Sequence, residues 1–206
     1  MRIEINLKII FVLILLFMFN NISTYLIFLF FILIHELAHL LVGVIIGGVP
    51  KKLSITILGV SIEFFSYGKN KTINKLIFFS IGPLVNLLIC FICNKFMGNS
   101  YMKNLIINTN LAIGIFNLFP ILPLDGGKIL KEFLRICFGF EKSNKITIFI
   151  SKLFLIIISL IYSVLIIKIK NIIILILLIY LWYLYSIEEK KYNLYLKTKM
   201  AMKKII

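Results

Sequence analysis

Long apolar runs, separated by short polar segments, account for most of the chain. A helix that crosses the hydrocarbon core of a bilayer needs about 20 predominantly apolar residues. The runs that approach this length predict six spanning helices, at 8–19, 22–46, 76–94, 104–122, 146–167 and 171–187. The first run is short and is followed by Asn20 and Asn21, so it is open whether this run crosses the membrane completely.

The segment 53–66 has a different pattern from the apolar runs around it. It is rich in β-branched residues, alternates in part between apolar and polar positions, and has Gly59 near its centre. This pattern predicts a short hairpin or a pair of strands at the membrane surface, although a reentrant or interfacial loop fits about as well. An unpaired strand edge there could hold an extended peptide by strand addition.

These patterns together predict an all-α polytopic membrane protein with about six transmembrane helices. A broken or reentrant segment rich in Pro and Gly is expected around 120–127, in addition to the short β element. We assign residues 1–187 to one transmembrane domain. Residues 188–206 are expected to form a short, basic cytosolic tail.

Composition and charge favour the same class of protein. Apolar residues make up 61% of the chain, compared with about 45–50% in a soluble domain. The net charge of +15 does not indicate a nucleic-acid-binding protein, because the basic residues punctuate the apolar runs and form no continuous patch. If both termini lie in the cytosol, the basic residues of the outward-facing segments are Lys95, Lys103, Lys168 and Lys170. Lys and Arg therefore follow the positive-inside rule in this orientation.

The run His35-Glu36-Leu37-Ala38-His39 lies inside the second apolar span. Residues four apart lie on the same face of a helix, so the two imidazoles can bind one metal ion. Glu36 follows the first histidine and can reach a water molecule at that metal. This is the HExxH arrangement of zinc hydrolases, in which the metal acidifies the water and the carboxylate acts as its base. We therefore predict His35 and His39 as ligands of Zn²⁺ and Glu36 as the catalytic residue.

The setting of this motif makes a chance match less plausible. His35 and His39 are the two histidines of the chain. Ionisable groups in the middle of a span cost roughly 2.5–3.5 kcal/mol each on insertion scales, so three of them on one helix need a common reason. A shared cation supplies that reason, whereas hydrogen bonds to neighbouring helices are the structural alternative.

Asp125 is the best candidate for a third metal ligand. A catalytic zinc site usually has three protein ligands and one open position, and no histidine remains. Asp125 is the one aspartate of the chain and follows the fourth span, in the run NLFPILPLDGG. The prolines of this run break the helix, and broken backbone at membrane depth is tolerated where it lines a cavity or is buried. The alternative for Asp125 is a helix cap, and Glu63 and Glu132 are the fallback ligands.

Two further polar positions lie in apolar surroundings. Asn117, at the end of the fourth span, is predicted to position the substrate backbone, although a role in tying helices together is nearly as plausible. The run Gly82-Pro83-Leu84-Val85-Asn86 in the third span introduces a kink and a polar side chain. We interpret this run as a helix-packing feature.

Three motifs of the chain resemble those of the site-2 protease family of intramembrane zinc metalloproteases. They are HELAH (35–39), SIGPLVN (80–86) and FNLFPILPLDGG (116–127), in the expected order and spacing, and the resemblance covers about residues 20–187. The closest branch is the one that contains stage IV sporulation protein FB. Many members of that branch carry a C-terminal nucleotide-sensing domain, for which the tail leaves no room, so the control of activity is an open question.

The resemblance implies the same site that the residue chemistry indicates. His35, His39 and Asp125 would bind zinc, Glu36 would be the catalytic base, and Asn117 would help to place the substrate. It also implies six spans and hydrolysis of peptide bonds within or beside the membrane. In the sporulation branch the substrate is a pro-sigma factor, cut at the outer forespore membrane, and inhibitory membrane partners are expected. A cytosolic active site agrees with the charge pattern.

Other classes of function remain possible from the sequence. A membrane zinc transporter or a metal-sensing membrane protein would explain ligands inside a span, but it would not explain the glutamate next to His35. A catalytically inactive membrane scaffold is the third alternative, which the intact motif disfavours. A prenyl-protein protease with the same motif is expected to take its third ligand from a glutamate, so Asp125 separates that class from the site-2 proteases.

Overall fold

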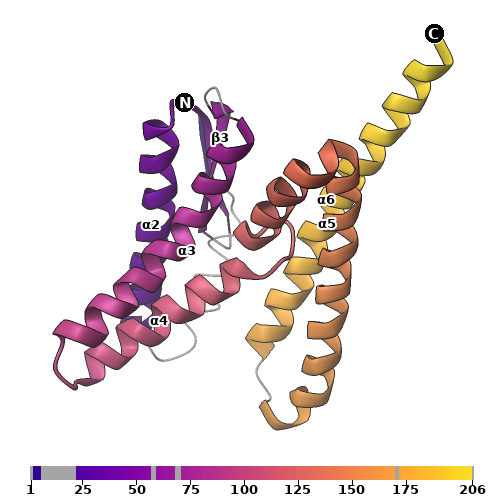
Figure 1. Cartoon of the computed structure of the whole chain (residues 1–206). Helices are drawn as coiled ribbons and strands as arrows, with labels where there is room; N and C mark the ends of the chain where they lie inside the picture. Colours follow the sequence, from indigo (N-terminus) through magenta and orange to yellow (C-terminus); the bar gives the residue numbers. More distant parts are fainter. Residues whose placement is uncertain (1, 6–21, 57–58, 68–70, 170–171, 206) are drawn as a thin grey trace. The chain divides into compact units, whose positions relative to one another are not determined.

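A computed structural model describes the chain except for residues 1, 6–21, 57–58, 68–70, 170–171 and 206. In chain order, its elements are β1 (Arg2–Ile5), α2 (Ile22–Ile45), β2 (Gly48–Thr56), β3 (Gly59–Tyr67), α3 (Lys71–Phe96), α4 (Tyr101–Leu118), α5 (Asp125–Ile169) and α6 (Ile172–Ile205). The chain divides into two compact units, Met1–Leu118 and Phe119–Ile206. Each unit is described by itself (Figure 1).

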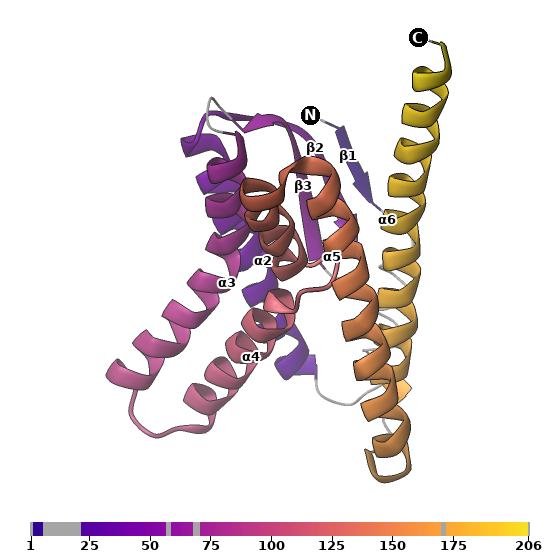
Figure 2. The ribbon, with the colours of Figure 1, turned by 45° about the vertical axis from the view of Figure 1, so that its right-hand side comes forward.

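The first unit combines a small sheet with three helices. The strand order is β1-β2-β3, with β1 parallel to β2 and β2 antiparallel to β3. The β2–β3 hairpin overlaps the segment 53–66, where the sequence predicts a hairpin or strand pair, but begins earlier, at Gly48. Its pairing is irregular near Pro50, which cannot donate a ladder hydrogen bond. The sheet lies along α2 (Figure 2). Whether it lies at the membrane surface stays a prediction.

Helices α3 and α4 of the first unit form an antiparallel hairpin (Figure 1). Gly114 permits close approach of the two helices, because a Cβ atom there would lie 3.4 Å from Cβ of Asn86 and 3.7 Å from the carbonyl oxygen of Pro83. At the turn, Ser100 accepts a hydrogen bond from the backbone N–H of Lys103, and the ammonium of Lys103 donates to the carbonyl oxygen of Asn94. Both bonds satisfy groups at helix ends that have no partner within their own helix.

The second unit consists of the loop 119–124 and two long helices that run side by side in both views (Figures 1 and 2). Helix α5 contains a break at Gly139, where φ is 77° and ψ is 175°, a conformation that glycine adopts at little cost. The indole N–H of Trp182 on α6 donates to Ser159 on α5, at 3.0 Å. Further along, Lys199 pairs with Glu141.

Burial along the described helices is inverted with respect to a water-soluble protein. His35, Asn86 and Asn110 are at most 2% exposed, whereas Phe91 is 64% and Val164 is 74% exposed. Within the described residues, three helical segments are long and apolar enough to cross a membrane: Leu26–Ile45, Lys71–Phe96 and Asp125–Val164. This arrangement is typical of an integral membrane protein, in which apolar side chains face lipid.

The helices match the predicted spans in part. The runs 22–46, 76–94, 104–122, 146–167 and 171–187 all fall largely within helices, and the first run, 8–19, lies outside the described residues. The fourth run ends at Leu118, four residues before the predicted end, and Pro120 accounts for the early stop because it lacks an N–H group. Helix α6 continues without a break from the predicted last span into the basic tail. Six spans, a reentrant segment and the boundary at 187 stay predictions.

Candidate metal centre

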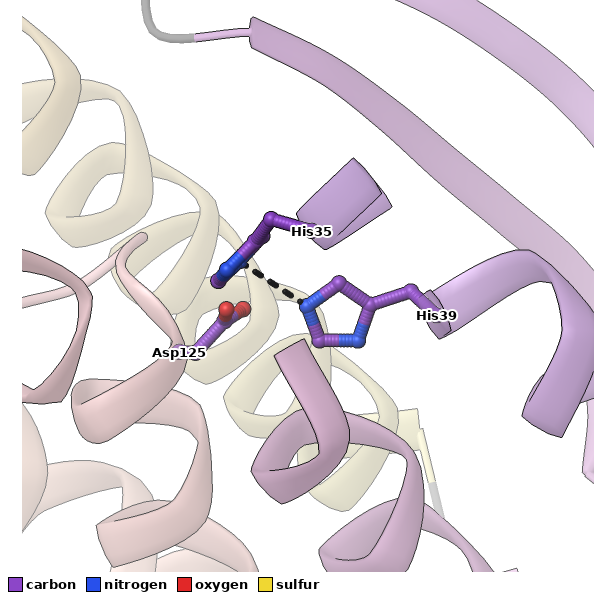
Figure 3. Close-up of side chains that lie close together, drawn as sticks. All are labelled: His35, His39 and Asp125. Carbon is purple, nitrogen blue, oxygen red and sulfur yellow. Dashed lines mark hydrogen bonds between the residues drawn. The ribbon is translucent and has the colours of Figure 1, made fainter. Parts of the chain in front are cut away.

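His35 and His39 lie one helical turn apart on α2 and are both buried, at 2% and 4% exposure. Their side chains project from the same face, as the spacing of four residues predicts. The two Nε2 atoms approach to 3.2 Å (Figure 3). The Nδ1 atoms point away from this meeting point and have partners of their own.

Both Nδ1 atoms face oxygen acceptors. Nδ1 of His35 lies 2.6 Å from Oδ1 of Asn86, and Nδ1 of His39 lies 2.6 Å from the backbone carbonyl oxygen of Phe78. A carbonyl oxygen only accepts, so each Nδ1 must carry the proton. In the neutral imidazole the lone pair then lies on the other nitrogen, Nε2. The two Nε2 lone pairs therefore face each other.

Two lone pairs at 3.2 Å repel unless a cation lies beside them. Zn²⁺ binds imidazole nitrogen at about 2.0–2.1 Å in a tetrahedral arrangement, which places two such nitrogens about 3.3 Å apart. The separation of the Nε2 atoms fits this value. Oxygen acceptors behind ligand imidazoles are also the usual outer partners in zinc sites, where they fix the tautomer and the ring orientation. The pair therefore has the donor chemistry and the spacing of a metal-binding pair.

Gly82 on α3 leaves the space that the two rings occupy. A Cβ atom at this position would lie 2.6 Å from Nε2 of His35 and would collide with Nε2 of His39. The next residue, Pro83, is buried inside α3 and has no N–H for the helical ladder. Only glycine therefore allows α3 to pass this close to the Nε2 edges of both imidazoles.

Glu36 follows His35 on α2 and is half-buried. A helix places adjacent residues about 100° apart around its axis, so Glu36 borders the face that carries the two histidines. Its position agrees with the HExxH pattern.

In the second unit, Asp125 is the first residue of α5 and is 6% exposed. Its Oδ1 atom lies 3.4 Å from the ammonium of Lys128, one turn further along the helix. The loop before it packs on the start of α5 at Gly127, where a Cβ atom would lie 2.5 Å from the carbonyl carbon of Ile121. The hydroxyl of the buried Ser151 accepts from the N–H of Leu122 and donates to the carbonyl oxygen of Pro120.

Within the part of the chain that the structure describes, His35, His39 and Asp125 make up a group of three buried side chains that could hold one metal ion (Figure 3). Each offers one ligand atom. Two imidazoles and one carboxylate are ligands that zinc accepts, with a fourth position left for water. Of the fallback ligands, Glu132 lies further along α5, 3.5 Å from Arg135, and is not in this group.

The structure adds residues that the sequence patterns did not assign to the site. Gly82 and Asn86 were expected to serve helix packing, but both contact the histidines. Asn110 was not singled out, although a buried asparagine in an apolar helix is a signal for a polar network. Asn117 is half-buried and donates to the carbonyl oxygen of Ile113 on its own helix, and its role toward substrate stays a prediction.

Comparison with known proteins gives a consistent picture. The model of Peptidase family M50 matches residues 94–161. A curated zinc metalloprotease of Methanocaldococcus jannaschii is 49% identical over 43 residues, which are 21% of this chain and 13% of that protein's length. The solved structure of a site-2 protease from the same organism is similar with a TM-score of 0.67 and 27% identity, over 90% of this chain and 89% of the other. About a third of the chain therefore matches the model of Peptidase family M50, and the chain shares the fold of a site-2 protease over most of its length.

Proposed function

We propose that this chain is an intramembrane zinc metalloprotease that hydrolyses peptide bonds of membrane-associated proteins within or beside the bilayer. The observation that carries the proposal is the buried pair of imidazoles whose Nε2 atoms face each other at 3.2 Å. The match to Peptidase family M50 and the likeness to a solved site-2 protease support the same activity. His35, His39 and Asp125 are the proposed zinc ligands.

The proposed chemistry divides between the metal and the chain. Zinc, when bound, supplies a Lewis acid that lowers the pKa of water to about 7 and polarises a carbonyl group. Glu36 takes the proton from the attacking water and passes it to the nitrogen of the leaving amine. His35 and His39 would present Nε2 to the metal, because their Nδ1 atoms face the oxygen atoms of Asn86 and Phe78. This reaction needs no covalent intermediate between the substrate and the protein.

The substrate would enter as an extended segment. Strand β3 lies at one end of the strand order, so one of its edges has no neighbour among the described strands. Addition of a peptide to such an edge satisfies the backbone groups of both partners. We propose that Asn117 contributes a further polar contact to the substrate backbone. The substrate class that follows from the sporulation-type resemblance is a pro-sigma factor.

The proposed topology has six spans and both termini in the cytosol, in accordance with the distribution of Lys and Arg. The active site then faces the cytosol. A pro-sigma substrate would place the enzyme in the outer forespore membrane, with inhibitory membrane proteins as further partners.

Co-expression with a membrane-associated pro-sigma factor tests the activity and the role of Glu36 together. We expect a size shift of the substrate on a blot with the wild-type chain and none with Glu36→Gln, while the purified variant keeps its zinc. Glu188→Gln is the matched control, since Glu188 pairs with Lys191 on α6, and it should cleave like the wild type. Cleavage by Glu36→Gln would disprove the role of the base. Zinc binding without cleavage of any membrane substrate would favour a metal-handling membrane protein.

A further inference from the structure

Three side-chain hydrogen bonds connect His35 to the backbone of α4. Nδ1 of His35 lies 2.6 Å from Oδ1 of Asn86, Nδ2 of Asn86 donates to Oδ1 of Asn110 at 3.0 Å, and Nδ2 of Asn110 donates to the carbonyl oxygen of Ile106 at 2.9 Å. The three residues come from α2, α3 and α4 of the first unit. The two asparagines are fully buried.

The chain of bonds has only one consistent direction. The carbonyl oxygen of Ile106 can only accept, so the amide nitrogen of Asn110 must face it and its oxygen must face Asn86. Asn86 then has to donate to that oxygen, which turns its own oxygen toward His35. The last acceptor in the series therefore requires a proton on Nδ1 of His35.

We infer that Asn86 is a positioning residue for the metal site and that Asn110 sets its orientation, so that together they lock His35 in the tautomer that presents Nε2 to the metal. This inference rests on the proposed metal site. Asn86 touches no reacting atom and acts only through the imidazole. A partner that accepts from the far nitrogen of a ligand histidine also raises the basicity of the ligating nitrogen.

The second histidine provides an internal contrast. His39 donates to the backbone carbonyl oxygen of Phe78, which no side-chain substitution removes. Substitutions of Asn86 should therefore affect His35 alone. Burial adds to the effect, because water cannot easily replace a lost partner at a position with no exposed surface.

Zinc affinity of the purified chain, measured by competition with a chelator, is the first test. Asn86→Ala should weaken zinc binding about 10- to 100-fold, the usual cost of losing an outer partner of a ligand. Asn86→Asp keeps an acceptor for Nδ1 and should recover most of the affinity. A role in helix packing alone predicts that Asn86→Leu, which fills a similar volume without an acceptor, recovers the affinity as well, whereas the inference predicts that it does not. Asn144→Ala is the matched control, as this buried asparagine donates to the carbonyl oxygen of Phe140 on its own helix, and it should bind zinc normally.

Asn110→Ala should have a smaller effect than Asn86→Ala. It removes the acceptor that orients the Asn86 amide, but the oxygen of Asn86 can still accept from His35. The double variant should bind zinc no more weakly than Asn86→Ala, since both changes act through one path. Additive losses would show two independent packing effects and would overturn the inference that Asn110 acts through Asn86.

Nitrogen-15 NMR gives a readout that needs no activity. The two histidines of the chain give two ring systems, assigned with His35→Gln. A hydrogen-bonded Nδ1–H signal of His35 should be present in wild type and in Asn86→Asp and absent in Asn86→Ala. Its persistence in a folded Asn86→Ala protein would refute the inference. Normal zinc affinity in Asn86→Ala would refute it as well, while Glu36-dependent cleavage would still stand. If the variants show the expected losses of zinc affinity but the chain cleaves no peptide, the proposed protease activity is refuted and the inference about Asn86 and Asn110 still holds.

Discussion

The two units supply their proposed metal ligands in physically different ways. In the first unit, His35 and His39 sit in the middle of one continuous helix, and buried polar partners hold the far side of each ring. In the second unit, Asp125 sits at the first residue of a helix, directly after a loop. The histidine pair therefore depends on helix geometry and side-chain hydrogen bonds, whereas Asp125 depends on how the loop backbone packs.

This difference predicts which kind of substitution each half of the proposed site should tolerate. Helix spacing fixes the direction of His35 and His39 before any tertiary contact forms. The start of α5 has no such guarantee, because helix ends fray unless other groups hold them. In the second unit these groups are the close contact at Gly127 and the hydroxyl of Ser151.

The largest effect is expected for Gly82→Ala. The new methyl group would occupy the space at Nε2 of both His35 and His39, the atoms proposed to bind metal. One ring or the helix that carries the new methyl must move, so we expect zinc binding to fall at least about 100-fold, beyond the cost of losing an outer partner. Zinc content after purification, determined by mass spectrometry, measures this effect.

Gly98→Ala is the matched control for Gly82→Ala. A Cβ atom at Gly98 would meet nothing within 4 Å, so this variant should retain its zinc. Full zinc content in Gly82→Ala would mean that the facing Nε2 atoms are not the metal-binding edge, and the pair would then be a structural contact.

Gly127→Ala tests the second unit in the same manner. Its Cβ atom would lie 2.6 Å from the carbonyl oxygen and 2.5 Å from the carbonyl carbon of Ile121, and backbone atoms cannot rotate away as side chains can. Overpacking of this kind costs about 1–3 kcal/mol, so the thermal midpoint in detergent should fall by about 2–12 °C for a chain of this size. Because Asp125 lies two residues before Gly127, zinc affinity should fall together with stability.

A loss of stability without a loss of zinc affinity would contradict the proposed link between the loop and the metal site. If Gly127→Ala lowers the thermal midpoint and leaves zinc affinity intact, the loop supports the fold and Asp125 does not contribute to the metal site. Asp125→Asn then decides the matter, since it keeps the size of the side chain and removes its charge.

Ser151→Ala should act on the same loop with an effect of similar size. The hydroxyl satisfies the N–H of Leu122 and bonds to Pro120, and its loss leaves a buried backbone donor without its partner. This costs about 1–3 kcal/mol. Differential scanning fluorimetry should detect the change, while Ser163→Ala, at an exposed serine that donates to the carbonyl oxygen of Leu160 on its own helix, should be neutral. An equal loss of stability in both variants would show that the loop bonds contribute nothing specific.

The sequence was sufficient to predict the parts of the site that depend on short-range geometry. The spacing of His35 and His39 predicted that both side chains would share one face of a helix, and the structure confirms this. The prolines predicted a break before Asp125, which coincides with the loop between α4 and α5. Most apolar runs predicted their helices for the same reason, because length and composition act locally.

The sequence was not sufficient for the contacts that link distant segments. Asn86 and Asn110 are 24 residues apart, and each of them alone is compatible with helix packing in a membrane. Only the approach of α2, α3 and α4 shows that the two amides lead to the imidazole of a proposed metal ligand. The same reason explains Gly82, whose importance depends on the two rings that lie against it.

The smallest effect is expected for Lys128→Gln, which removes the ion pair with Asp125 in the first turn of α5. The two charged atoms are 3.4 Å apart and Lys128 is about one-third exposed (35%), so the pair contributes little to stability, within about 1 kcal/mol. The ammonium, however, competes with a metal ion for the same carboxylate. We therefore expect zinc to bind slightly more tightly in Lys128→Gln, whereas Lys191→Gln, which removes an exposed pair of the same spacing on α6, should leave zinc affinity unchanged. Weaker zinc binding in Lys128→Gln would mean that this lysine orients the carboxylate, and Asp125 would then depend on a side-chain partner in the way that His35 does.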